Sequence, residues 1–359
     1  MKTRIVVLVV GLAWSGSALA DPDPDLNAPA MRAWTFFAQI NSIAAKQSTV
    51  KGQKTNDALW ETWADDPATF PSDCKTPVWP GAAPSKKLRR SLLQLLVEAE
   101  RSNKKLTAHD ISARPFIEVG GTEEVRRNKA SFDFIVKNGL WYVEGIERSA
   151  GAAIAGYHYP TAGAPESPAV AFPVDAIEVK ANWKPITAAD KPNYHWNLDS
   201  QGNLFGLVAM HLITKSIPMW TWATFEHVDN PARCDHIGCY DPFGAAPAYT
   251  ATNGQICKGY AAGALTPALV ELLKKHKVPA EFQHYRLKGT QTSFIDQNGF
   301  PTLLANSVTE CGGTTSCPGD CSNITSSCMT CHALARADAQ NGVRSDFVFS
   351  SGPTSPAKY

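Results

Sequence analysis

Residues 204–213 read Leu-Phe-Gly-Leu-Val-Ala-Met-His-Leu-Ile, and residues 219–227 read Met-Trp-Thr-Trp-Ala-Thr-Phe-Glu-His. The first stretch is nearly all apolar, which is typical of a strand that is buried on both sides. Ser216-Ile217-Pro218 interrupts the pattern between the two stretches. We therefore expect two antiparallel strands at the centre of a sheet.

Outside this pair, the chain alternates between helical and extended patterns. Ile177–Trp183 alternates apolar and polar residues, as a half-buried strand does. Apolar positions spaced by three and four predict helices elsewhere. The further strands are expected at Phe116–Val119, Leu140–Val143 and Glu281–Leu287. The helices are expected at Ala28–Ala45 (capped by Asn27, with Pro29 in its first turn), Ser85–Ser102, Ala130–Lys137 and Pro267–His276 (capped by Thr266).

Residues 1–20 have the pattern of a secretory signal peptide. Lys2 and Arg4 precede the apolar run Ile5–Trp14, and Ala18-Leu19-Ala20 is a small-residue cleavage site. We expect cleavage after Ala20 and a periplasmic or secreted protein. No later run reaches the roughly 18 apolar residues of a membrane span, so we expect no span in the mature chain.

The charge balance argues against a nucleic-acid partner. The 359-residue chain has a formal net charge of +1, and loss of Lys2 and Arg4 with the leader changes it to −1. No basic patch and no acidic tail stand out, so the composition is that of an ordinary globular protein.

Cys328-Met329-Thr330-Cys331-His332 carries the chemistry. Two cysteines separated by two residues and followed by histidine form the attachment motif of a covalent c-type haem. Cys328 and Cys331 would form thioethers with the two vinyl groups, and His332 would be the proximal iron ligand. A zinc site or a redox disulfide are the alternatives, but the adjacent histidine and the export signal favour one covalent haem c per chain.

The remaining cysteines predict disulfides in an exported protein. Two groups lie in loop-like stretches rich in Gly and Pro, and we interpret both as disulfide staples, with zinc as an alternative for the second. Because the total is odd, one cysteine is left over. The groups are Cys234, Cys239 and Cys257, and Cys311, Cys317 and Cys321, with Cys74 separate.

Any distal ligand of the iron must come from residues that precede the motif, or else the distal coordination position is open. No methionine follows Met329, which excludes the arrangement of small cytochromes c. The candidate distal ligands are Met210, His211, Met219 and His227, and more weakly His195; core packing is the alternative role for each. For proton transfer the candidates are His211, His227 and Glu226.

A resemblance is carried by Cys328–His332 together with Ser345-Asp346-Phe347-Val348-Phe349. This end of the chain resembles that of the lysine-cross-linked haem cytochromes that oxidise hydroxylamine, and equally that of the β-type cytochromes c-prime, which bind nitric oxide. The resemblance implies a β-rich body and a distal iron face open to a small molecule. It does not assign the cross-linking lysine, for which Lys180, Lys184 and Lys215 are possible only by their strand context.

Together these patterns predict an α+β fold with N-terminal helices, a largely antiparallel central sheet and a disulfide-rich C-terminal segment that attaches haem. The expected organisation is a signal peptide (1–20), an α+β body (21–310) and a Cys-rich tail (311–359). The expected function is that of a periplasmic monohaem cytochrome performing electron transfer or small-molecule redox chemistry, with a redox protein or a small oxidant or reductant as partner. A pure electron carrier, or a binding domain with haem as an appended electron port, are the alternatives.

Overall fold

The computed structural model describes residues 24–71, 75–81, 122–142, 145–146, 148, 170–252, 259–310, 327–333 and 346–348. Several predicted features lie outside these residues. They are the leader, the helix Ser85–Ser102, the strand Phe116–Val119, and the cysteines Cys74, Cys257, Cys311, Cys317 and Cys321.

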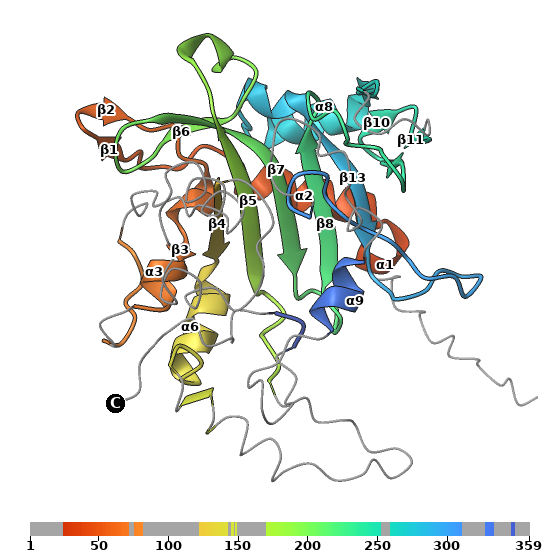
Figure 1. Ribbon diagram of the computed structural model, residues 1–359. Coiled ribbons are helices and arrows are strands. Elements are labelled where there is room, and N and C mark those ends of the chain that lie inside the picture. The colour runs from red at the N-terminus through yellow and green to blue at the C-terminus, as the bar shows by residue number, and fades with distance from the viewer. Residues whose placement is uncertain are drawn as a thin grey trace, which may run out of the picture.

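A seven-stranded antiparallel sheet forms the centre of the structure (Figure 1). The strand order is β13-β8-β7-β5-β4-β3, and β6 also pairs with β7. The predicted antiparallel pair β7–β8 lies inside the sheet, with β5 and β13 on its two sides. The strands are β3 (Ala64–Asp65), β4 (Thr122–Arg127), β5 (Ile177–Pro185), β6 (Trp196–Leu198), β7 (Leu204–Thr214), β8 (Thr221–His227) and β13 (Tyr285–Gln291).

Helices and short strand pairs surround this sheet, so the α+β class is confirmed. The helices are α1 (Pro24–Asn27), α2 (Pro29–Ile40), α3 (Asp66–Thr69), α6 (Lys129–Lys137), α8 (Pro267–Lys275) and α9 (Cys328–His332), with 3₁₀ turns η1 (Leu59–Thr62), η2 (Ala188–Asp190) and η3 (Ala280–His284). The two-stranded pairs are β1 (Thr49–Val50) with β2 (Gln53–Lys54), β9 (Cys239–Tyr240) with β11 (Tyr249–Thr250), and β10 (Ala245–Ala246) with β12 (Ala264–Leu265).

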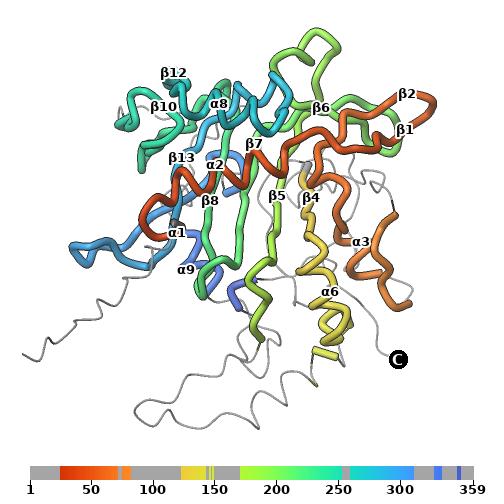
Figure 2. Tube along the Cα trace, turned by 180° about the vertical axis from the view of Figure 1, so that it is seen from behind, coloured from red at the N-terminus to blue at the C-terminus, as the bar shows by residue number. Residues whose placement is uncertain are grey.

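Helix α2 covers one face of the sheet and forms the larger core with it (Figure 2). Its buried residues recur at the predicted helical spacing. The Phe225 ring of β8 lies 4.9 Å from the Trp34 ring and 4.3 Å from the Phe37 ring, measured between centroids. Met210 of β7 belongs to the same core. This face is therefore an apolar layer between sheet and helix.

The helix ends agree only partly with the predicted caps. Pro29 occupies the first turn of α2 as expected, but Ala28 is the N-cap residue and provides no side-chain cap, so the prediction of Asn27 is wrong. The prediction for α8 is confirmed, because the Thr266 side chain accepts a hydrogen bond from the Leu269 amide.

Two predicted strands are wrong over part of their length. Leu140–Tyr142 form a turn rather than a strand, because Gly139 has φ +68° and the Leu140 amide donates to Ile135 O, which ends helix α6. Ala280–His284 form η3, and the strand begins only at Tyr285. In both places a local turn uses the backbone hydrogen bonds that a strand would have used.

The opposite face of the sheet has a smaller apolar cluster and many polar groups. Ile213 and Trp222, which are paired across β7 and β8, pack with Leu304 and Met329. Met329 belongs to α9, which lies near the start of β8 (Figures 1 and 2). The short Cys-rich helix is thus fixed to the sheet face that α2 leaves uncovered.

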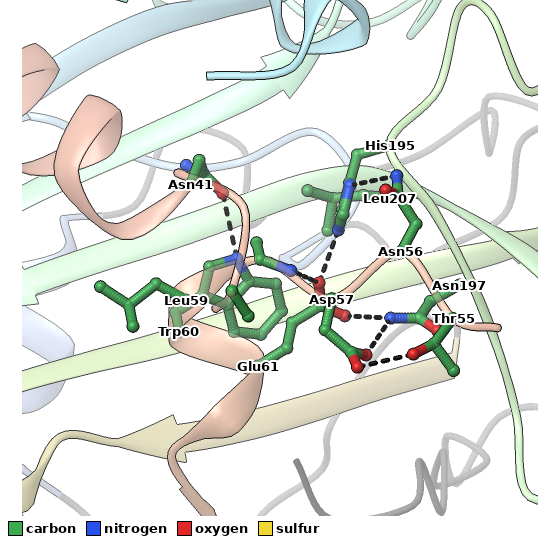
Figure 3. A network of polar contacts seen from close by, with 12 residues as sticks. Asn41, Thr55, Asn56, Asp57, Leu59, Trp60, Glu61, His195, Asn197 and Leu207 are labelled. Carbon is green, nitrogen blue, oxygen red and sulfur yellow. Dashed lines mark hydrogen bonds and ion pairs between the residues drawn. The ribbon is translucent and has the colours of Figure 1, made fainter. Parts of the chain in front are cut away.

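A buried polar network joins η1 to β6 (Figure 3). The His195 ring contacts Glu61 at 2.7 Å (Nε2 to Oε2), and the Asn197 amide donates to both Asp57 and Glu61. Burial alone would lower the pKa of His195, but the charge of Glu61 and the hydrogen bonds to Glu281 and Glu61 raise this pKa above 6.5. His195, which was a weak ligand candidate, is therefore part of a structural network.

Within the described residues, no helix combines the length and hydropathy that a bilayer crossing requires.

We predict that Phe225→Ala lowers the free energy of unfolding by about 3–5 kcal/mol, because it empties the space between two aromatic rings in a fully buried site. Phe300→Ala is the matched control, since that side chain is 67% exposed. Denaturant titration measures both. Equal effects of the two substitutions would contradict this description of the core.

The raised pKa of His195 predicts a pH dependence of stability. The protonated ring stabilises the folded state fully below pH 6.5, and this contribution is lost as the pH rises through the higher folded-state pKa. The difference in unfolding free energy between the wild type and His195→Gln should therefore shrink as pH rises above 6.5. His236→Asn is the control, because the His236 side chain is exposed. If the difference in unfolding free energy between the wild type and His195→Gln does not change with pH, the prediction is refuted.

Candidate functional site

Helix α9 is held in place by backbone and side-chain hydrogen bonds at its start. Ser327 caps the helix by accepting from the Thr330 amide. The Cys328 amide and its thiol both point at Leu304 O, at 3.2 and 3.1 Å. Gln291 at the end of β13 accepts from the Met329 amide at 3.0 Å. The motif is thus fixed to β13 and to the segment that follows it.

Cys328 and Cys331 are both present as thiols outside any disulfide. Cys328 is partly buried and Cys331 is exposed. Burial raises the pKa of both thiols, and the charge of Glu310 acts in the same direction. The two sulfurs are therefore protonated near neutral pH in the metal-free protein.

The orientation of His332 is set by a backbone carbonyl. Its Nδ1 lies 2.7 Å from Phe347 O, and because a carbonyl oxygen only accepts, Nδ1 is the donor; Nε2 is then the nitrogen that could bind a metal. The Trp222 ring lies 4.5 Å from the imidazole, between centroids. Burial lowers the pKa of His332 to about 4, so the ring is neutral at pH 7, as a metal-binding imidazole must be.

A polar group on the sheet accompanies this histidine. His211 of β7 contacts Glu310 at 3.1 Å (Nε2 to Oε1), and Lys180 lies opposite His211 on β5. The charges of Lys180, His211 and Glu310 all affect the pKa of His332, which places them in its electrostatic neighbourhood. The Lys180 amine is 3.2 Å from Glu123 Oε2. An acid–base pair and a cation therefore lie on the same side of the sheet as the motif.

Segment 306–310 brings Glu310 to this position. The Ser307 amide donates to Glu226 Oε1 at 2.9 Å, and the Asn306 amide group donates to Thr224 Oγ1 at 2.7 Å. The Asn306 backbone amide in turn donates to Glu310. Burial alone would raise the pKa of Glu310, but the charge and hydrogen bond of His211 lower it, so the carboxylate is ionised.

The structure brings together four of the predicted site residues: Cys328, Cys331, His332 and His211. Met210 and His227 lie on the α2 side of the sheet instead, because side chains alternate along a strand. His227 is held there by Asn193 O at 2.9 Å and by the stacked Tyr194 ring.

Two other candidates lie on the motif's side of the sheet in different roles. The Glu226 carboxylate accepts hydrogen bonds from Ser307 and Asn230, and it lies 3.5 Å from the buried amine of Lys288. Glu226 therefore anchors segment 306–310. Met219 packs at the edge of the apolar cluster that includes Cys328, and its carbonyl accepts from the Trp222 indole.

The three lysines considered for a cross-link have separate environments. Lys180 lies in the neighbourhood of His332. Lys184 donates to the Tyr194 hydroxyl at 2.8 Å, near the opposite end of β5. Lys215 forms a buried ion pair with Asp346. Among these, position alone favours Lys180.

Sequence reasoning missed Glu310, Trp222 and Phe347. Trp222 carries a signal, because strand alternation places it on the same face as His211. Glu310 and Phe347 carry none, since a non-local hydrogen bond in each case gives the residue its role.

The donor set fits a covalently attached haem. Two protonated thiols stand on one short helix with an imidazole whose Nδ1 is engaged by a carbonyl. Within the described residues, no three His, Cys, Asp or Glu side chains form a metal-binding group, so the two cysteines find no further zinc ligands there. The prediction of a disulfide within the first cysteine group is confirmed, and the structure supplies the pairing that the sequence left open, Cys234 with Cys239.

Comparison with known proteins gave no family: no protein-family model, curated protein or solved structure matches the chain.

Proposed function

We propose that this chain is an exported c-type haem protein with one haem, bound through thioethers to Cys328 and Cys331 and with His332 as proximal ligand. The observation that carries the proposal is the geometry of α9: two thiols outside any disulfide beside an imidazole whose Nδ1 bonds Phe347 O at 2.7 Å. The leader predicted at residues 1–20 supports a periplasmic or secreted location, where covalent attachment of this kind takes place.

Within this proposal, small-molecule redox chemistry is favoured over simple electron carriage. When bound, the iron would supply one-electron chemistry and a coordination position for a small ligand. His211 and Glu310 form a hydrogen-bonded acid–base pair in the neighbourhood of His332, which can hold and pass a proton. Met210, the buried methionine of β7, packs on the other face of the sheet. The resemblance to cytochromes with an open distal iron face agrees with this reading.

The residues around the motif would serve three tasks. The apolar cluster of Ile213, Trp222 and Leu304 excludes water from one side of α9. His211 and Glu310 hold a proton. The partly exposed α9 leaves a route for an electron from a periplasmic redox protein, since Cys331 lies at the surface.

We predict that the exported protein, produced with the haem-ligation machinery, gains the mass of one haem, and that Cys328→Ala with Cys331→Ala abolishes this gain. The matched control is Cys234→Ala with Cys239→Ala, which removes the disulfide and should retain the haem. Intact mass measures all three proteins. A wild type with the mass of the bare polypeptide would refute the proposal. If haem is lost only when Cys234 and Cys239 are replaced, the haem is not attached to Cys328 and Cys331.

The optical spectrum distinguishes small-molecule chemistry from electron carriage. We predict a high-spin ferrous form that takes up carbon monoxide, because Met210 packs on the α2 side of the sheet and His211 Nε2 is engaged by Glu310 at 3.1 Å. Met219 lies on the motif's side, so a sulfur-to-iron band in the oxidised spectrum would identify it as the sixth ligand instead. A six-coordinate low-spin spectrum, unchanged by carbon monoxide, would favour the electron carrier. His211→Ala then tests the distal side, since a shift to high spin in that variant would make His211 the sixth ligand.

A further inference from the structure

The carbonyl that orients His332 belongs to an unusual turn. Asp346 and Phe347 have φ values of +54° and +66°, a left-handed conformation that residues with a Cβ adopt rarely and almost never in succession. Such a conformation persists only when the surrounding contacts impose it. The turn ends with Phe347 O at 2.7 Å from His332 Nδ1.

A buried ion pair imposes this conformation. The Lys215 amine lies 2.6 Å from Asp346 Oδ1, and the two side chains are 9% and 6% exposed. The same amine donates to Pro218 O at 2.5 Å, and the other carboxylate oxygen of Asp346 accepts from the Phe172 amide at 2.7 Å. Asp346 is thus held by two segments: the one before β5, which contains Phe172, and the one that joins β7 to β8, which contains Lys215.

These contacts form a continuous chain from the sheet to the imidazole. Lys215 directly follows the last residue of β7, Thr214, so the sheet fixes its backbone. The ion pair fixes Asp346, and the next residue presents its carbonyl to His332. Each link is within hydrogen-bond distance, and one peptide unit separates the carboxylate-bearing residue from the acceptor.

We propose that Lys215 and Asp346 are positioning residues for the axial histidine, and that through Phe347 O they set the basicity of His332 toward iron; this rests on the proposed function. A hydrogen bond from Nδ1–H to a carbonyl increases the donor strength of Nε2. A stronger donor stabilises ferric iron more than ferrous iron, and so lowers the reduction potential. Lys215 was considered above for a cross-link to haem. The proposal gives it a different role, which is to position His332 through its ion pair with Asp346.

The direction in which the reduction potential changes in Lys215→Met separates a positioning role of Lys215 from a direct effect of its charge on the iron. Removing the Lys215 cation by itself would favour the more positive ferric centre and lower the potential. Loss of the positioned carbonyl instead weakens the donor and raises the potential. Lys215→Met therefore tests the two explanations in opposite directions.

The experiment compares the haem-loaded wild type with Lys215→Met, Asp346→Asn and the control Lys184→Met. Lys184 lies at the far end of β5 and bonds Tyr194, so its loss should not reach α9. Intact mass first establishes haem attachment. The readouts are the midpoint potential and the iron–histidine stretching frequency in the resonance Raman spectrum of the ferrous protein.

We expect both site variants to keep the haem, to lower the stretching frequency and to raise the ferrous-to-ferric ratio at fixed ambient potential on the order of tenfold. For one electron this ratio corresponds to about 59 mV. Lys184→Met should match the wild type. Should Lys215→Met not fold, Asp346→Asn, which preserves the shape of the side chain, carries the test through the stretching frequency alone, because loss of its negative charge would by itself raise the potential.

The inference is overturned if either haem-loaded variant keeps the wild-type stretching frequency, or if the potential of Lys215→Met is unchanged or falls. A wild-type frequency already typical of a histidine without a strong Nδ1 hydrogen bond would overturn it without any variant. A wild type without covalent haem overturns the proposed function instead, which keeps the two failures apart.

Discussion

The alternation of side chains along β7 and β8 is the constraint on which the rest of the structure depends. It sends Met210 and Phe225 to the α2 face, and His211 and Trp222 to the face on which α9 packs. A shift of register by one residue would exchange these two sets completely. The apolar set is large enough on the α2 side to fix the register, because Trp34, Phe37 and Phe225 are fully buried there. The chemistry of the second face follows from that choice.

The second face carries buried polar groups beside its smaller apolar cluster, and residues 306–310 form hydrogen bonds with several of these groups. Glu226 accepts from Ser307, and Asn306 donates to Thr224, so residues 306–310 lie against β8. The Thr309 hydroxyl extends the attachment to Asn182 of β5 at 2.6 Å. A buried carboxylate is costly unless it is hydrogen-bonded, and these bonds meet that requirement. The same segment carries Glu310 to His211 and begins just after Leu304, whose carbonyl fixes Cys328.

The sequence predicted what depends on local periodicity and missed what depends on distant partners. The strands Ile177–Trp183 and Leu204–Ile213 and the helix Ala130–Lys137 were predicted correctly, because their apolar spacing repeats along the chain. The turn at Leu140 and the start of β13 were wrong, because apolar residues in a tight turn give the same short pattern as a strand. The class α+β followed from the mixture of periods and is confirmed.

For the candidate site, the motif was recognisable and its surroundings were not. Cys328, Cys331 and His332 are defined by spacing alone. His211 was one of several equivalent candidates until the sheet register separated it from Met210 and His227. Glu310 and Phe347 derive their positions from contacts over 99 and 15 residues, which no local pattern encodes. The surroundings of the motif were therefore beyond the reach of the sequence.

The central claim is that α9 carries covalent haem. It is tested most directly by peptide mass spectrometry of the exported protein, on the fragment that contains Cys328–His332. The account predicts this fragment with the mass of one haem added and with neither cysteine open to alkylation. An unmodified fragment whose two cysteines are alkylated, or one that is lighter by two hydrogens because they form a disulfide, would contradict it.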